Sequence, residues 1–317
     1  MCQGAGMVSG AVRPARLGEG DLVELVSPAG AADPAVVEVA VGVLTGWGLR
    51  VRLGEHALGR RHDYLSGTDE QRLADVNHAL RDPEVRAVVC VRGGYGTQRI
   101  VDGVDFAAVR ADPKLVMGFS DITALHSALW CEARLATVHG PTGSQLVGGL
   151  DSRTVRSARS ILFGAEPVVV AAEADEETFG VRVAGRASGV LLGGNLTLLA
   201  TTAGTRHRPD PTGAILLLED VGEEPYRVDR SLVQLRRSGW LEGVAGVAVG
   251  QFTNCVGEDK VSPTVAEVLA EELGALGVPV LGGLPIGHGE QQVAVGLGVR
   301  AVLDADAGSL TIQAVTS

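Results

Sequence analysis

"KLVMGFSDITALHSALW", residues 114–130, joins an apolar run to a segment with helical spacing. The run predicts a buried strand, and the segment after it predicts a helix. Ser120 lies at the junction, where its hydroxyl either caps the helix or stands exposed at the end of the strand. The second glycine of a G-x-S-x-G motif is absent, because Ile122 occupies that position. Taken alone, the stretch favours a helix cap, Ser120 or Asp121, over a nucleophile.

Strands and helices alternate from the beginning of the chain up to this stretch. The apolar runs and helical spacings predict three strands, within 21–30, 49–54 and 85–96, and two helices, within 33–48 and 68–85. Such alternation is typical of parallel βαβ units. Residues 19–150 are therefore predicted to form a doubly wound α/β domain, whose sites lie at the carboxyl ends of its strands.

The rest of the chain predicts a second domain at 186–317. An apolar strand at 214–218 and helical segments around it support this prediction, and the end of the chain alternates like a hairpin that turns at Asp306–Gly308. The pattern weakens over residues 151–185, and the stretch AAEADEETFG at 171–180 is acidic and poorly periodic, so we expect an interdomain connection at 151–185. The first 18 residues are expected to form a flexible tail.

Composition excludes several classes of function. The net charge of −11 argues against a general nucleic-acid or anionic-membrane surface. No run approaches the ~20 apolar residues of a membrane span, and the N-terminal sequence lacks the apolar core of a secretory signal. The four cysteines show neither CxxC pairs nor metal-ligand spacing, which suits a reducing cytoplasm and predicts no metal site.

A glycine-rich segment, VRGGYGTQR at 91–99, follows the predicted strand at 85–90. Paired glycines after a strand let backbone amides form an anion-binding nest. The segment is not a dinucleotide fingerprint, because Arg99 stands where the third glycine would be, and it is not a Walker loop. A tight turn without a ligand is the alternative. Arg92, Gly93 and Arg99 are candidate substrate-binding residues, since the two guanidinium groups would suit a carboxylate.

A nucleophilic serine requires a base and an acid that orients it. His139 and His288 both follow apolar runs and lie beside glycine, so both are candidate bases. The strand at 214–218 ends in Glu219 and Asp220, and adjacent strand residues face opposite sides, so only one of them can face a given site. A buried carboxylate needs a partner, which could be a histidine, an arginine or a helix N-terminus.

Six motifs in order give the chain a family resemblance: RGGYGTQR, GFSDITALH, HGP, GGNLTLL, LEDVGEEPYRVDR and PIGHG. Together they resemble the murein LD-carboxypeptidase family of serine peptidases, over about residues 20–300. That family also contains self-immunity amidases that destroy microcin-type aminoacyl-nucleotides. The resemblance implies a flavodoxin-like N-terminal domain, a smaller mixed β/α C-terminal domain, a site at their interface and a homodimer.

The resemblance also implies roles for individual residues. Ser120 would be the nucleophile, Glu219 the acid and His288 the base. Backbone amides of Gly94 and Asp121 would form the oxyanion hole, with Gly93 as the alternative to Gly94. No metal or cofactor is implied.

The activity implied is release of the terminal D-alanine from a murein tetrapeptide, in cytoplasmic cell-wall recycling, with a muropeptide as the only partner besides a second copy. The microcin-type amidase is the alternative within hydrolases. An aromatic platform for a nucleobase would favour it, yet residues 151–213 contain only two aromatic side chains, Phe163 and Phe179. A non-catalytic α/β module that binds a phosphate or carboxylate at the glycine-rich turn is the alternative from another class.

Overall fold

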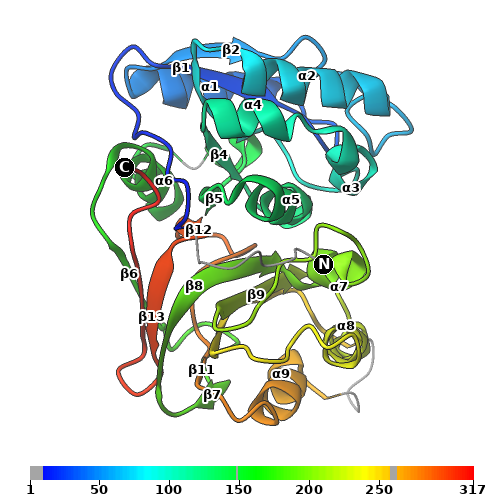
Figure 1. Ribbon diagram of the computed structural model, residues 1–317, viewed down its shortest axis with the longest axis vertical. Helices are drawn as coiled ribbons and strands as arrows, with labels where there is room; N and C mark the ends of the chain where they lie inside the picture. The colour runs from blue at the N-terminus through cyan, green and yellow to red at the C-terminus, as the bar shows by residue number, and fades with distance from the viewer. Residues whose placement is uncertain (1–9, 148, 258–262) are drawn as a thin grey trace.

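The computed structural model describes residues 10–147, 149–257 and 263–317, which form two sheets flanked by helices. Figure 1 shows the early elements, coloured blue to green, in one half and most later elements, coloured yellow-green to red, in the other. The two-domain α/β architecture predicted from the sequence is therefore confirmed.

The first sheet contains five parallel strands in the order β2-β1-β3-β4-β5, followed by an antiparallel sixth strand, β12. The order 2-1-3-4-5 is that of flavodoxin-like folds. The strands are β1 (Leu22–Val26), β2 (Arg50–Leu53), β3 (Val85–Cys90), β4 (Leu115–Gly118), β5 (Thr137–His139) and β12 (Val295–Leu297).

Helices cover both faces of this sheet: α1 (Pro34–Gly46), α2 (Asp69–Arg81), α3 (Thr97–Ile100), α4 (Phe106–Ala111) and α5 (Thr123–Ala133). Alternate residues of β1 point to opposite faces, so Leu25 packs in one apolar cluster with α1 and Val26 in another with α2 and α5. Asp33 caps α1, and Thr68 forms a capping box at the start of α2, as their sequences predict.

The second sheet has the order β6-β14-β13-β8-β9-β10-β11-β7, in which β8 to β11 are parallel and the outer pairs antiparallel. Its strands are β6 (Val168–Ala171), β7 (Arg182–Val183), β8 (Arg186–Asn195), β9 (Ile215–Val221), β10 (Gly246–Thr253), β11 (Val280–Leu281), β13 (Arg300–Asp304) and β14 (Ser309–Ile312). Helices α7 (Leu196–Thr202), α8 (Pro225–Arg237) and α9 (Val265–Gly274) lie beside it (Figure 1). The predicted terminal hairpin is β13–β14.

Strand β12 joins the two halves of the chain. It comes late in the sequence, yet it pairs with β5 in the first sheet, where Val295 lies opposite His139. The loop that precedes β12 contains His288, and β5 pairs with β4, the strand before Ser120. This pairing carries a C-terminal loop to the edge of the N-terminal sheet at which Ser120 lies.

Two expectations require correction. Residues 10–18 were expected in a flexible tail, but Leu17 is buried and its N–H donates to Leu162 O, while Val12 forms a bridge with Leu135. Burying one leucine side chain is worth about 1.5–3 kcal/mol, which offsets part of the entropic cost of ordering the segment. Residues 1–9 of that expected tail lie outside the described residues.

The segment 151–185 contains regular structure, where only an interdomain connection was expected. Helix α6 (Arg153–Phe163) buries Val155, Ala158 and Ile161 in an apolar cluster that residues of both sheets share. Strand β6 then pairs with β14, and β7 pairs with β11, so each lies at one edge of the second sheet.

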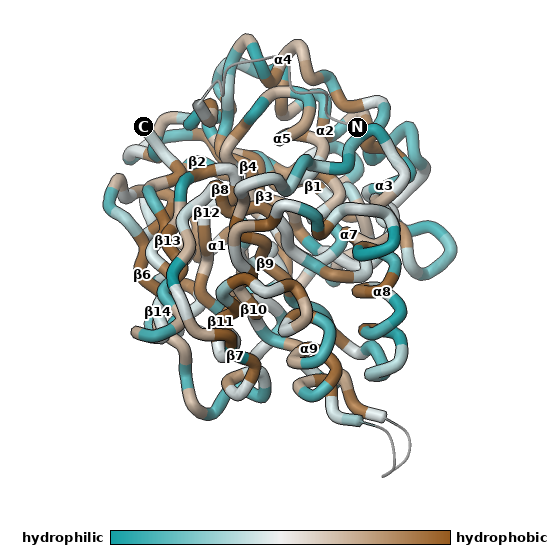
Figure 2. Tube along the Cα trace, turned by 60° about the horizontal axis from the view of Figure 1, so that its bottom comes forward, coloured by the Kyte–Doolittle hydropathy of each residue, from teal (hydrophilic) through white to brown (hydrophobic). Residues whose placement is uncertain are grey.

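Hydropathy follows the layers of the fold. Figure 2 shows hydrophobic residues along the central strands and hydrophilic residues on the outer helices and loops. Among the described residues, no helix has the length and apolar character that crossing a membrane requires.

Candidate active site

Ser120 occupies a strained position at the end of β4. Its φ of 64° lies in the left-handed region, which a non-glycine residue adopts at a cost of about 1–3 kcal/mol and which often marks a functional site. The short helix η2 (Ser120–Ile122) leads into α5, and neither helix has a side-chain cap. The helix-cap interpretation of Ser120 is therefore wrong.

Asp121 does cap a helix, but a different one. Its buried carboxylate accepts a hydrogen bond from Thr97 N, at 2.8 Å, and so caps α3 rather than α5. Burial raises the pKa of this carboxyl group above its ordinary value. The backbone N–H of Asp121 is the second of η2, and N–H groups in the first turn of a helix have no partner within that helix.

The glycine-rich turn lies directly against Ser120. A Cβ atom placed on Gly93 would lie 2.9 Å from Ser120 Cβ and 3.1 Å from its Oγ, so any side chain there would displace the serine. Gly94 adopts a φ of 101°, a conformation that favours glycine. The turn after β3 and the serine after β4 thus meet at the carboxyl edge of the sheet.

His288 and Glu219 form a close pair that the second domain supplies. His288 Nδ1 lies 2.6 Å from Glu219 Oε2. The Glu219 side chain, at the end of β9, is completely buried, whereas 14% of the His288 side chain is exposed. A Cβ on Gly287 would lie 2.8 Å from Glu219 Oε2, so glycine there leaves the room that the carboxylate occupies.

The His288 imidazole lies next to the residue that precedes Ser120. The rings of Phe119 and His288 have centroids 4.5 Å apart. Burial alone would lower the pKa of His288, but the charge and hydrogen bond of Glu219 outweigh it, so the pKa is raised above its ordinary value. With its Nδ1–H donated to the carboxylate, the neutral ring has Nε2 free to accept a proton.

Asp220 faces away from this pair. Its carboxylate accepts hydrogen bonds from Asn195 Nδ2 at 2.8 Å and from the backbone N–H and hydroxyl of Thr197 at 3.0 and 2.9 Å. The alternation of strand residues therefore places Glu219, and not Asp220, against His288, in agreement with the one-sided facing expected from the sequence.

His139, the other candidate base, is enclosed in β5. Within the described part of the chain neither of its ring nitrogens has a hydrogen-bond partner, and burial lowers the pKa of the ring well below its ordinary value. Its ring packs at 5.8 Å from that of Phe119. This environment suits a neutral packing residue, so of the two candidate bases it is His288 that has an orienting carboxylate.

The two arginines of the glycine-rich turn are exposed. Arg92 Nη1 donates to Ala31 O at 2.5 Å. The Arg99 guanidinium binds both carboxylate oxygens of Asp69, at 2.8 and 2.7 Å, which offsets its charge. Their predicted part in substrate binding stays a prediction.

Gln251 is a site residue that the sequence analysis missed. Its Oε1 accepts from Gly289 N at 2.8 Å and its Nε2 donates to Glu176 Oε1 at 2.7 Å, so it anchors the loop that carries His288. A polar residue inside the apolar run of β10 was the available signal.

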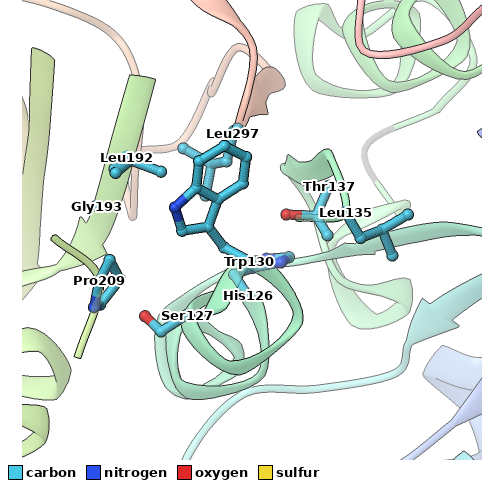
Figure 3. A pocket seen from close by; sticks show the side chains of 10 residues that line it. His126, Ser127, Trp130, Leu135, Thr137, Leu192, Gly193, Pro209 and Leu297 are labelled. Atoms are coloured by element: carbon cyan, nitrogen blue, oxygen red, sulfur yellow. The ribbon is translucent and has the colours of Figure 1, made fainter. Parts of the chain in front are cut away.

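A small cavity lies between the domains but does not include Ser120. Figure 3 shows Trp130 and Ser127 of α5 facing Leu192 of β8 across it, with Leu297 nearby. Its mainly apolar lining suits interdomain packing. Among residues 10–147, 149–257 and 263–317, no three histidine, cysteine or acidic side chains gather as metal ligands.

Comparison with family models gives two matches. A model described as the LD-carboxypeptidase N-terminal domain matches residues 23–140, and one described as the LD-carboxypeptidase C-terminal domain matches residues 188–303. The murein tetrapeptide carboxypeptidase of Pseudomonas aeruginosa is 37% identical over 289 residues, which cover 89% of this chain and 92% of that protein.

Two solved structures are similar over nearly the whole chain. The muramoyltetrapeptide carboxypeptidase of Oxalobacter formigenes is 30% identical with a TM-score of 0.80, covering 93% of this chain and 100% of its own. An MccF-like protein from Bacillus anthracis is 25% identical with a TM-score of 0.85, covering 96% and 100%. MccF itself is named as a microcin C7 self-immunity protein.

Proposed function

The chain belongs to the LD-carboxypeptidase family, and on this premise we propose that it is a serine peptidase that releases the terminal D-alanine of murein tetrapeptides. Its relatives in Pseudomonas and Oxalobacter carry the names of tetrapeptide carboxypeptidases. The observation that carries the proposal is the buried Glu219–His288 pair, whose imidazole packs beside Phe119 and so beside Ser120.

The proposed reaction is an acyl transfer through Ser120. His288 Nε2 accepts the hydroxyl proton of Ser120 as its oxygen attacks the carbonyl carbon of the L-D amide bond. The C–N bond then breaks, and the imidazolium returns the proton to the departing amine of D-alanine. Water, deprotonated by the same imidazole, hydrolyses the acyl-enzyme and restores Ser120. Throughout, Glu219 keeps the Nδ1–H tautomer and stabilises the imidazolium.

The negative oxygen of the tetrahedral intermediate would be held by backbone amides. The N–H groups of Gly94 and Asp121 are the candidates, because the glycine-rich turn contacts Ser120 and Asp121 lies in the first turn of η2. Removing one oxyanion donor typically lowers turnover by about 10²–10³-fold.

An amidase acting on aminoacyl-nucleotides is the second candidate, and one observation favours it. Outside residues 151–213, Tyr95 of the glycine-rich turn has an exposed ring whose centroid lies 5.9 Å from that of the exposed Tyr64. Two such rings could stack on a nucleobase as well as on a sugar. The similarity to the MccF-like protein supports this second candidate only in that the two proteins are related.

The decisive experiment measures D-alanine release from a murein tetrapeptide with an L-D terminal bond, beside its D-D analogue and an aminoacyl-nucleotide. We expect turnover of the first substrate and little of the other two. A protein that a serine-directed fluorophosphonate leaves unlabelled would instead be a binding module, because a binder has no activated nucleophile.

A further inference from the structure

Arg72 of α2 has a completely buried guanidinium. Its Nη1 donates to Pro28 O and, at 2.8 Å, to Gly96 O, and its Nη2 lies 2.5 Å from Asp69 Oδ1. A buried charge is costly unless it is paired and hydrogen-bonded, and the carboxylate and two carbonyls meet that requirement at Nη1 and Nη2. Among the described residues, Nε has no hydrogen-bond partner.

The two carbonyls belong to loops that end neighbouring strands. Pro28 follows β1, and Gly96 closes the glycine-rich turn after β3. The same loops are joined a second time, because Gly30 N donates to Gly93 O at 3.0 Å. A Cβ on Gly96 would lie 2.7 Å from Arg72 Nη1, so the glycine leaves the space that the guanidinium fills.

The turn held in this way is the one that contacts Ser120. Gly93 lies between the Gly30 contact on one side and Ser120 on the other. The far end of the turn is fixed by Arg72 at Gly96 and by the Asp121 carboxylate at Thr97 N. A shift of the turn would therefore move the amides proposed to hold the oxyanion relative to the nucleophile.

We infer that Arg72 is a positioning residue for catalysis, which fixes the 93–96 turn against Ser120 through Gly96 O and Pro28 O. The expected effect of Arg72 on kcat rests on the proposed function. Its structural content, that one guanidinium holds the turn in place, is independent of the substrate.

Lys114 offers a matched control in the same domain. Its ammonium is also completely buried and donates at 2.8 Å to two backbone carbonyls, Asp82 O and Val85 O, with Asp112 as its carboxylate partner. Those carbonyls lie at the amino end of β3, at the edge opposite to Ser120. Loss of either cation removes a similar set of bonds, but only Arg72 bonds to the turn.

The test compares Arg72→Met, Arg72→Lys and Lys114→Met with the wild type. For the Arg72 variants we expect kcat on the tetrapeptide to fall by about 10- to 100-fold with little change in KM, because a 1 Å misplacement costs about that much. The kcat of Arg72→Lys should lie between those of wild type and Arg72→Met, since an ammonium group can replace only some of the hydrogen bonds that the guanidinium donates. Lys114→Met should lose thermal stability and keep its kcat.

Hydrogen exchange separates failure of this inference from failure of the proposed function. The amides of residues 93–97 should exchange faster in Arg72→Lys than in wild type or Lys114→Met, whether or not the tetrapeptide is a substrate. If wild type does not cleave the tetrapeptide but this exchange pattern holds, only the proposed function fails. Unchanged exchange in the turn, or a folded Arg72→Met with kcat within twofold of wild type, would overturn the role of Arg72.

Discussion

Glu219 Oε2 lies 2.6 Å from His288 Nδ1, and the two residues come from a buried strand end and a glycine-flanked loop. The loop reaches this place because β12, which follows it, pairs with β5 of the other domain. The acid and base therefore approach the serine only when the two halves are folded together.

Replacing the acid tests this pair. Glu219→Gln should lower kcat by about 10³–10⁴-fold, the scale seen when an orienting carboxylate becomes an amide and the imidazole takes the wrong tautomer. Asp220→Asn is the control, since that carboxylate bonds to Asn195 and Thr197 instead. Asp220→Asn should lower the melting temperature and leave kcat close to that of wild type. A larger loss of kcat in Asp220→Asn than in Glu219→Gln would mean that the strand faces the other way in solution.

The pH dependence of wild type follows from the raised pKa of His288. The base must be neutral, so kcat/KM should rise with pH through a value above the ordinary ~6.5 of histidine. In Glu219→Gln the carboxylate no longer opposes burial, so the residual activity should rise at lower pH. Rate profiles of both proteins over the same buffers check this, and identical midpoints would contradict it.

As pH rises, the contribution of His288 to the stability of the fold should fall while activity rises. Because the folded protein binds the His288 proton more tightly than the unfolded chain, the pair stabilises the fold fully below about pH 6.5. That contribution is lost as pH rises through the raised pKa of His288. Relative to His288→Gln, wild type should thus lose part of its free energy of unfolding over this window, as measured by urea denaturation. A difference that grows with pH there would contradict the sign.

The close approach of Gly93 to Ser120 predicts a steric effect. Gly93→Ala places a methyl group 2.9 Å from Ser120 Cβ, so the serine must move and kcat should fall by about 100-fold or more. Gly42→Ala, on the exposed side of α1 with open space around the new methyl, should keep its kcat. Fluorophosphonate labelling rates provide a second measurement. Equal labelling of wild type and Gly93→Ala would show that the turn is farther from the serine.

Much of this arrangement could be predicted from the sequence, because local patterns encode it. The caps at Asp33 and Thr68, the α/β alternation and the one-sided facing of Glu219 and Asp220 follow from periodicity and chemistry. The family resemblance, rather than local pattern, selected Glu219 and His288 from the alternatives.

The missed features depend on contacts between distant parts of the chain. Nothing in the local pattern at Val295 indicates that it pairs with His139 rather than with its sequence neighbours. The buried role of Arg72 was hidden because a polar helix residue is ordinarily exposed. Helix α6 was the exception, since the spacing of its apolar residues was readable.

Substrate choice tests the exposed tyrosine pair. If a tetrapeptide is the substrate, its kcat/KM should exceed that of an aminoacyl-nucleotide. If the nucleotide is preferred, Tyr64→Ala or Tyr95→Ala should weaken nucleotide binding by ~1–3 kcal/mol, the contribution of one stacked base. Tyr226→Ala, an exposed tyrosine on α8, is the control. A higher kcat/KM for the nucleotide would replace the proposed substrate and leave the roles of Ser120 and His288 standing.

The most direct test of the account is turnover by Ser120→Ala, with Ser127→Ala of the following helix, α5, as control. Because the Ser120 side chain caps neither η2 nor α5, the alanine variant should fold with a melting temperature close to that of wild type. We predict that D-alanine release from the L-D tetrapeptide then falls by about 10⁴-fold or more, while Ser127→Ala stays active. A folded Ser120→Ala protein that releases D-alanine within tenfold of the wild-type rate would contradict the assignment of Ser120 as the nucleophile.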